Sequence, residues 1–179
     1  MENKRLLEVR NLKTHFHSKS GIFRAVDGIS FRANEGEIIG LVGESGCGKS
    51  VTALSLLRLV TAPGKIESGE VLLDGEDLLQ MDENKLNSVR GKIVSIIFQD
   101  PVASLNPTMT VGEHMLEAIK LNQDIDTSIA IQKAEELLTK VGITDPKARL
   151  RQHPFQLSGG MNQRVMIALS MIGQPRLLI

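Results

Sequence analysis

The segment Gly43–Ser50 constrains the fold more strongly than any other part of the chain. It reads Gly-Glu-Ser-Gly-Cys-Gly-Lys-Ser and fits the pattern Gly-x-x-x-x-Gly-Lys-Ser/Thr. A short apolar run, Ile38–Val42, precedes it, and apolar residues at helical spacing follow it over Ser50–Val60. The apolar run is too short for a helix and predicts a buried strand. Strand, glycine-rich loop and helix in this order are typical of an α/β core.

The residue types in this segment suit phosphate binding. Glycines allow successive backbone N–H groups to turn toward one anion, and the N-terminus of the following helix adds a favourable dipole. Lys49 would pair with the β- and γ-phosphates of ATP, and the Ser50 hydroxyl would ligate Mg²⁺. A glycine-rich turn with a surface lysine is the alternative, but the flanking strand and helix favour a nucleotide site. The predicted ATP-binding residues are Gly43, Glu44, Ser45, Gly46, Cys47, Gly48, Lys49 and Ser50.

Composition excludes several classes of protein. Lys plus Arg and Asp plus Glu are both 21, and there is no Trp or Tyr, so nucleic acid is not an expected partner. Every apolar stretch is shorter than the roughly 20 residues of a membrane span. Cys47 is the single cysteine, which excludes an internal disulfide. Its place at a helix start favours a thiolate, although a small residue merely tolerated in the loop explains it as well.

The rest of the chain changes from β-rich to helical. Strands are expected at Leu6–Leu12, Phe23–Phe31, Ile93–Phe98 and Leu177–Ile179. The segment Gly69–Glu76 predicts a hairpin, because Asp74-Gly75 suits a type I′ turn. Helices are expected at Thr110–Lys120, Ser128–Val141 and Ser158–Ile172. The four histidines, His15, His17, His114 and His153, do not form a ligand cluster at metal spacing.

A second glycine-containing helix start lies more than a hundred residues after the first, at Leu157–Met161. Ser158 is a good N-cap, and Gly159 and Gly160 leave the backbone bare at the start of the helix. An ordinary helix cap is the alternative. A lone glutamine, Gln99, also follows the expected strand Ile93–Phe98.

Taken together, these motifs resemble the ATP-binding subunit of an ABC transporter over all 179 residues. Gly43–Ser50 matches the Walker A motif, Gln99 the Q-loop, and Leu157–Met161 the signature motif, with Met161 replacing the usual glutamine. The resemblance implies an α/β P-loop NTPase fold, with an ABC-type core, an N-terminal antiparallel β-subdomain and a helical subdomain insertion. It assigns residues 1–98 and 165–179 to the core with its β-subdomain, and residues 99–164 to the Q-loop and helical subdomain.

The resemblance also implies a composite site. Two such domains dimerise head to tail, so that ATP lies between the Walker A motif of one and the signature motif of the other. Ser158 and Gly160 would contact the γ-phosphate held by the partner, within a signature that includes Gly159 and Met161. Gln99 would approach Mg²⁺ and the attacking water as a catalytic residue. Phe16 occupies the position of the adenine-stacking aromatic, although a core or hairpin side chain is the alternative reading.

Four segments resemble the oligopeptide and dipeptide importers and their nickel-importing relatives: Ala25–Phe31, Gly43–Cys47, Phe98–Gly112 and His153–Met161. The implied partners are a second, different ATP-binding subunit and transmembrane permease subunits that contact the segment after Gln99. A solute-binding protein would be an indirect partner, and the subunit would lie peripherally on the cytoplasmic face of the membrane. Import of nickel or another small solute is one alternative, and a non-hydrolytic nucleotide-binding fragment is another. A soluble ABC ATPase acting on DNA or ribosomes would carry insertions or tandem cassettes that this chain lacks.

The last residues depart from the family. Leu177–Ile179 matches the start of the Walker B strand. The Mg²⁺-ordering aspartate, the catalytic glutamate and the switch histidine would all lie beyond Ile179. We therefore expect a partial ABC domain with the C-terminal part of the core missing, which binds ATP weakly, hydrolyses it negligibly alone and tends to aggregate.

Overall fold

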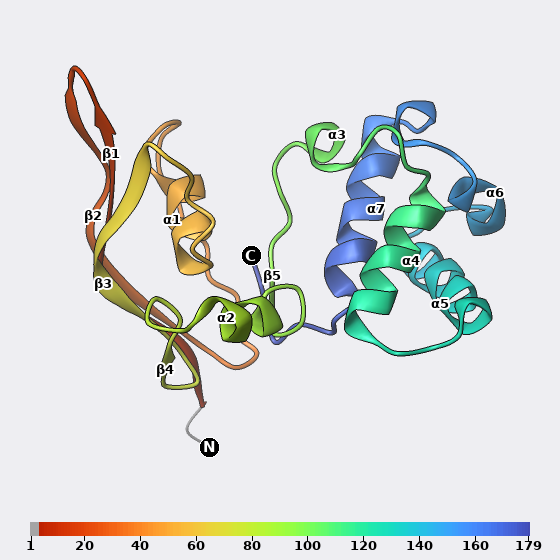
Figure 1. Ribbon diagram of the computed structural model, residues 1–179, viewed down its shortest axis with the longest axis horizontal. Coiled ribbons are helices and arrows are strands. Elements are labelled where there is room, and N and C mark those ends of the chain that lie inside the picture. The colour runs from red at the N-terminus through yellow and green to blue at the C-terminus, as the bar shows by residue number, and fades with distance from the viewer. Residues whose placement is uncertain (1–3) are drawn as a thin grey trace. The chain divides into compact units, whose positions relative to one another are not determined.

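The computed structural model describes residues 4–179, which form two compact units with the boundary between Asn87 and Ser88. The first unit is built on an antiparallel sheet with strand order β2-β1-β3-β4 (Figure 1). Its strands are β1 (Arg5–Ser18), β2 (Gly21–Asn34), β3 (Gly64–Leu73) and β4 (Glu76–Asp77). The predicted strands at Leu6–Leu12 and Phe23–Phe31 are confirmed, and both are longer than the sequence pattern indicates.

The turn between β3 and β4 is of the predicted type. Asp74 and Gly75 have φ angles of 51° and 87°, and two consecutive positive φ values define the type I′ geometry. This turn has the twist that two antiparallel strands need, which explains why an Asp-Gly pair connects them.

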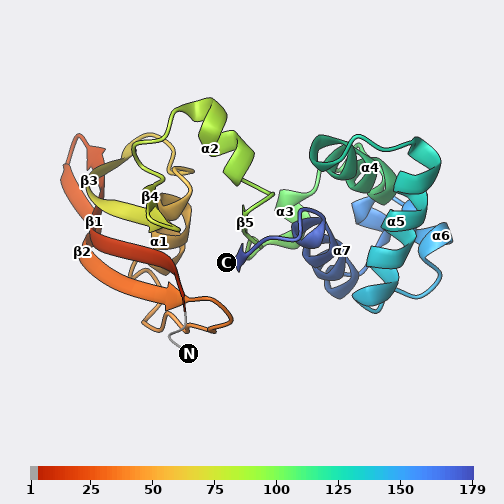
Figure 2. The ribbon, with the colours of Figure 1, turned by 90° about the horizontal axis from the view of Figure 1, so that it is seen from below.

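Helix α1 (Lys49–Leu56) packs on one face of the sheet of the first unit (Figure 2). The buried hydroxyls of Thr14 on β1 and Ser55 on α1 are 2.8 Å apart and share a hydrogen bond. The predicted helix Ser50–Val60 is too long, because Arg58 turns to a φ of 52° soon after α1 ends. A left-handed residue cannot continue a right-handed helix.

The predicted buried strand at Ile38–Val42 is wrong in this structure. The segment is irregular, and Ile38 and Val42 are 98% and 92% exposed. A strand exists only where its backbone pairs with a neighbour, and no pairing among the described residues involves this run. A continuous apolar run is typical of a strand in a parallel sheet with neighbours on both sides, and the antiparallel sheet of the first unit offers no such place.

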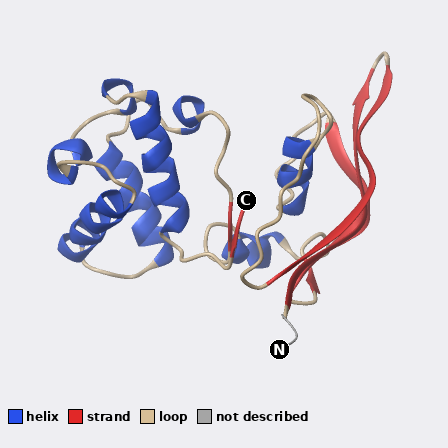
Figure 3. Ribbon diagram, turned by 180° about the vertical axis from the view of Figure 1, so that it is seen from behind, coloured by secondary structure: helices blue, strands red, loops and turns tan. Residues whose placement is uncertain are grey.

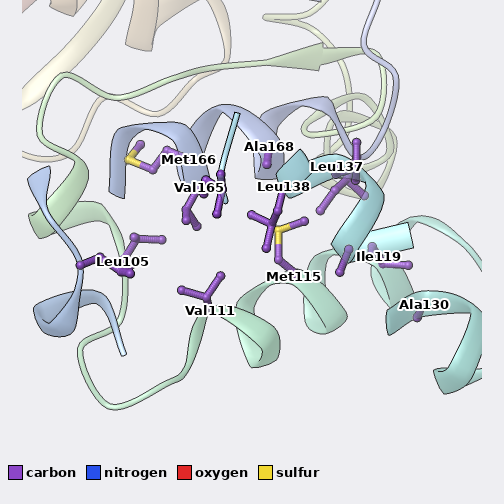
Figure 4. Close-up of a cluster of buried hydrophobic side chains, with 14 residues drawn as sticks. Leu105, Val111, Met115, Ile119, Ala130, Leu137, Leu138, Val165, Met166 and Ala168 are labelled. Atoms are coloured by element: carbon purple, nitrogen blue, oxygen red, sulfur yellow. The ribbon is translucent and has the colours of Figure 1, made fainter. Parts of the chain in front are cut away.

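The second unit is mainly helical. Its helices after α2 (Glu83–Val89) are α3 (Pro101–Ser104), α4 (Val111–Asn122), α5 (Thr127–Lys140), α6 (Pro146–Leu150), the 3₁₀ turn η1 (Pro154–Gln156) and α7 (Gly159–Met171). The three predicted helices correspond to α4, α5 and α7, whereas α2, α3, α6 and η1 were not predicted. Figure 4 shows the core between α4, α5 and α7, formed by side chains such as Val111, Met115, Leu138 and Val165.

Two short parallel strands complete the second unit (Figure 3). They are β5 (Val94–Ser95) and β6 (Leu177–Leu178), and Val94 pairs with Leu177. The predicted strands at Ile93–Phe98 and Leu177–Ile179 therefore exist, but the first is shorter than expected. The second is not buried, since Leu178 is 47% exposed.

Candidate functional site

The loop before α1 has a backbone that its glycines make possible. Gly46 and Gly48 have φ angles of 81° and 94°, in the left-handed region that side chains disfavour. A Cβ on Gly48 would lie 2.1 Å from the backbone oxygen of Ala25 on β2. A Cβ on Gly43 would lie 2.5 Å from the Cys47 sulfur. The Gly48 position is therefore closed to a side chain by the backbone of β2, whereas a side chain at Gly43 would require the Cys47 side chain to move.

The Lys49 side chain turns back into this loop. Its ammonium nitrogen donates to the backbone oxygens of Gly43 at 2.8 Å and Glu44 at 2.7 Å. The Cys47 sulfur lies 3.6 Å from the same nitrogen. The charge of Lys49 is thus held within the loop, where an anion bound by the backbone N–H groups would meet it.

The start of α1 is open to a ligand. Gly48 occupies the N-cap position and supplies no side-chain hydrogen bond, so no cap side chain competes for the first-turn N–H groups. Ser50 lies in this first turn and is exposed. Thr52 bonds back to the oxygen of Gly48 through both its backbone N–H and its hydroxyl, which fixes the loop to the helix.

Phe16 lies on β1 in the same unit. It is directly opposite Gly64 on β3 and Phe23 on β2. A Cβ on Gly64 would lie 2.7 Å from the Phe16 ring and 2.6 Å from the Val60 side chain. The ring is half-buried, so part of it packs in the hairpin and part of it remains accessible.

The predicted signature residues form the start of α7 in the second unit. Ser158 is the N-cap, and its hydroxyl accepts from the backbone N–H of Met161 at 3.3 Å. Leu157 is buried, and Gly159 and Gly160 are exposed, with open space where a Cβ would stand. Sequence reasoning overlooked Asn162, whose buried amide donates to the oxygen of Pro154 at 2.9 Å and ties η1 to α7.

Gln99 is exposed in the connection between β5 and α3. The next residue, Asp100, accepts from the backbone N–H of Ala103 at 3.1 Å and thereby caps α3. A shallow hollow follows along this connection and one side of α7, lined by residues that include Phe98, Leu105, Met166 and Leu169.

The structure therefore brings the predicted residues together in groups. Gly43–Ser50 form one loop, and Phe16 lies on the sheet of the same unit, whereas Gln99 and Ser158–Met161 belong to the second unit. Among residues 4–179, no three His, Cys, Asp or Glu side chains gather as a metal-binding group. No helix in the described part of the chain has the length and apolar character needed to cross a membrane.

These features define an ATP-binding cassette, and the comparison with known families agrees. The ABC transporter family model matches residues 26–179. The chain therefore belongs to the ABC transporter family of ATP-binding domains.

The similar curated proteins narrow the group. The chain is 47% identical over 174 residues to the dipeptide transport ATP-binding protein DppD of Escherichia coli, which covers 97% of this chain and 53% of that protein. It is 46% identical over 175 residues to a probable peptide ABC transporter ATP-binding protein of Sinorhizobium fredii, covering 97% of this chain and 52% of that protein. The chain thus spans about half the length of the curated relatives it matches.

A solved structure supports the fold. A dimeric ATP-binding cassette in a post-hydrolysis state, bound to ADP and Pi, superposes with a TM-score of 0.86. The match covers 97% of this chain and 72% of that one, at 24% sequence identity. This confirms the predicted α/β, ABC-type fold.

Proposed function

We propose that this chain binds ATP with Mg²⁺ as part of a subunit that energises peptide import across a membrane. The observation that carries the proposal is the loop Gly43–Ser50, where left-handed glycines, an inward-turned Lys49 and an uncapped helix start converge. The peptide substrate rests on the relatives, because the names of both state peptide or dipeptide transport.

The fit of the loop to ATP follows from its chemistry. The phosphates would take the place of the Gly43 and Glu44 oxygens as partners of the Lys49 ammonium, since a charged acceptor makes the stronger hydrogen bond. The exposed Ser50 hydroxyl would supply one oxygen ligand to Mg²⁺. Gln99 would supply a second oxygen and orient the attacking water.

The signature helix start supports a composite site. Within a helix, glycine is a weaker helix former than alanine by up to about 1 kcal/mol. Within the part of the chain that the structure describes, neither crowding nor a positive φ explains Gly159 or Gly160. Close approach of another molecule to the start of α7 would explain these glycines. We expect that molecule to be the ATP whose phosphates are held by a second ATP-binding subunit. A heterodimer is the form that the peptide-importer resemblance favours.

The proposal also covers ATP hydrolysis and the contact with permease subunits. Ser50 and Gln99 offer Mg²⁺ only neutral oxygens, which bind it less well than carboxylates, so we expect the 179-residue chain alone to hydrolyse ATP negligibly. Permease subunits would contact the segment after Gln99, where the hollow along α7 begins. The subunit would then lie on the cytoplasmic face of the membrane.

Calorimetric titration of the chain with ATP and Mg²⁺ tests the binding. Lys49→Ala should weaken ATP at least about tenfold, because a charge-assisted phosphate contact is lost. Lys120→Ala is the matched control, since it removes an exposed lysine from α4 and should leave the affinity unchanged. Equal affinities of the wild-type chain and the Lys49 variant would contradict the proposal.

A further inference from the structure

An exposed phenylalanine on β2 stands beside the position expected to stack on the base of ATP. Phe23 is 62% exposed, and it is directly opposite Phe16 in the antiparallel pairing of β1 with β2. Directly opposed residues in antiparallel strands project from the same face, with Cβ atoms roughly 5 Å apart. The two rings therefore stand side by side on one face of the sheet.

That face is the one that carries α1. Thr14 and Phe16 are two residues apart on β1, so they share a face, and Thr14 bonds to Ser55 of α1 at 2.8 Å. On β2, an irregularity next to Phe23 places an extra residue, Ala25, opposite β1. The oxygen of Ala25 is the atom against which Gly48 packs. The end of the phosphate loop and the two phenylalanines thus meet the sheet at neighbouring points.

The two rings have different environments. The outer edge of the Phe16 ring leans over Gly64 on β3 and approaches Val60. Phe23 stands on the other side of Phe16, on β2, with most of its surface uncovered. Stacking of a base on an aromatic ring is worth about 1–3 kcal/mol and tolerates any base, so an uncovered ring at this place can contribute to binding of the base.

We propose that Phe23 is a second base-binding residue, which forms with Phe16 an aromatic platform for the purine of the bound nucleotide. The proposal deepens the proposed function and rests on it, since the phosphate loop fixes the end of the nucleotide that Phe23 does not touch. The platform holds the base by its faces and adds apolar contact area next to the half-buried Phe16.

The platform does not select between purines. The polar side chains that flank Phe16 on its face are Thr14 and Ser18. Thr14 is engaged with Ser55, and Ser18 bonds to the oxygen of Gly21 and the hydroxyl of Ser20. Because these hydroxyls are already used, ring faces dominate the contact, and the platform holds ATP and GTP about equally.

The neighbouring residue supplies a matched control. Ile22 is 60% exposed, nearly as much as Phe23, but it is opposite His17 and so projects from the other face of the sheet. Ile22→Ala and Phe23→Ala remove similar exposed apolar side chains from adjacent positions. Phe23→Leu keeps the apolar volume and removes only the ring.

The experiment is calorimetric titration of the wild-type chain and the three variants with ATP, GTP and inorganic triphosphate, each with Mg²⁺. Phe23→Ala should weaken ATP and GTP alike, by about tenfold, and leave triphosphate binding unchanged. Phe23→Leu should lose most of the same affinity, and Ile22→Ala should match the wild type.

Four results would overturn the platform: Phe23→Ala matching Ile22→Ala, Phe23→Leu matching the wild type, weakened binding of triphosphate as well as ATP, or a loss confined to one purine. Failure of the proposed function is a distinct result. In that case the wild-type chain binds neither ATP nor triphosphate, and the proposed role of Phe23 is rejected together with the proposed function.

Discussion

The two glycine-rich helix starts of this chain differ in what holds their glycines in place. Before α1, Gly46 and Gly48 adopt positive φ angles, and a side chain on Gly48 would collide with the backbone of β2. At the start of α7, Gly159 and Gly160 have neither a positive φ nor a neighbour within 4 Å of a Cβ. The first set is demanded by the fold of its own unit, and the second is not.

This difference separates the two phosphate contacts that we propose. The loop before α1 is shaped in advance, with the Lys49 ammonium already bound to its carbonyl oxygens. The start of α7 is an ordinary helix start, which Ser158 caps and where the two glycines have no side chains. Replacing a glycine should therefore damage folding in the first region and only function in the second.

The largest expected effect is that of Gly48→Ala. The new Cβ would stand 2.1 Å from the Ala25 oxygen, in a residue with a φ of 94°, so the loop must shift. We expect the local stability of α1, measured by hydrogen exchange of its amides, to fall by about 3 kcal/mol. ATP binding should be lost as well.

Gly46→Ala is the control for Gly48→Ala. It shares the positive φ, at 81°, but a Cβ there meets nothing within 4 Å. Only the left-handed strain remains, which costs about 1–2 kcal/mol. Equal losses in the two variants would show that crowding against β2 does not matter, and would weaken the comparison of the two regions.

Gly160→Ala should have the opposite sign. It sits at the second position of α7 in open space, so the unfolding free energy should rise by up to about 1 kcal/mol. Gly112→Ala is matched, because it is the second residue of α4, but a Cβ there would lie 2.8 Å from the Leu150 oxygen. That variant should lose about 1–2 kcal/mol through overpacking. Urea unfolding followed by far-ultraviolet circular dichroism measures both.

Gly160→Ala also tests whether the start of α7 serves binding to a second subunit. Gly160→Ala should leave ATP binding by the single chain unchanged, while it weakens ATP-dependent association with a second ATP-binding subunit, measured by sedimentation. A destabilised Gly160→Ala variant would mean that the glycine serves the fold of the second unit, and the composite-site argument would lose its support.

Local chemistry in the sequence predicted the fold where each element depends on its own residues. Asp74-Gly75 specifies its turn, and Thr110 and Ser158 mark the starts of α4 and α7. Ile38–Val42 failed because its burial depends on strands beside it, which no local pattern encodes. Phe23 was read only as part of a strand, because its relation to Phe16 arises from the β1–β2 register, which an irregularity at Ala25 alters.

The residues of the candidate site also differ in how far local sequence could predict them. The backbone form of the loop Gly43–Ser50 could be predicted, since one continuous segment carries both the glycines and the lysine, and its binding of phosphate stays a prediction. The places of Gln99 and Phe16 were inferred from resemblance, and their roles remain predictions. Asn162 could not have been found, because a polar residue inside a helix gives no sign that its amide is buried against Pro154.

The smallest expected change in stability comes from the N-terminal caps of α4 and α7. In α4, Thr110 accepts from the Glu113 N–H, and the Glu113 carboxylate accepts from the Thr110 backbone N–H at 2.6 Å and its hydroxyl at 2.8 Å. These hydrogen bonds, led by the backbone one, lower the pKa of Glu113 below its ordinary value. In α7 the corresponding third position is Met161, which carries no charge. The cap of α4 should therefore be sensitive to acid, and that of α7 should not.

The lowered pKa of Glu113 determines how the stability of the protein changes with pH. A carboxylate with a lower pKa in the folded state stabilises that state fully above its ordinary pKa, and the contribution is lost as the pH falls below about 4. Thr110→Ala should lower the unfolding free energy by about 1 kcal/mol at pH 7. Glu113→Gln should remove part of the difference in stability between pH 6 and pH 3. Because the Ser158 hydroxyl accepts from the backbone N–H of uncharged Met161, Ser158→Ala should lower stability by a similar amount at both pH values. A pH-dependent loss there would show that the two helix starts are capped alike.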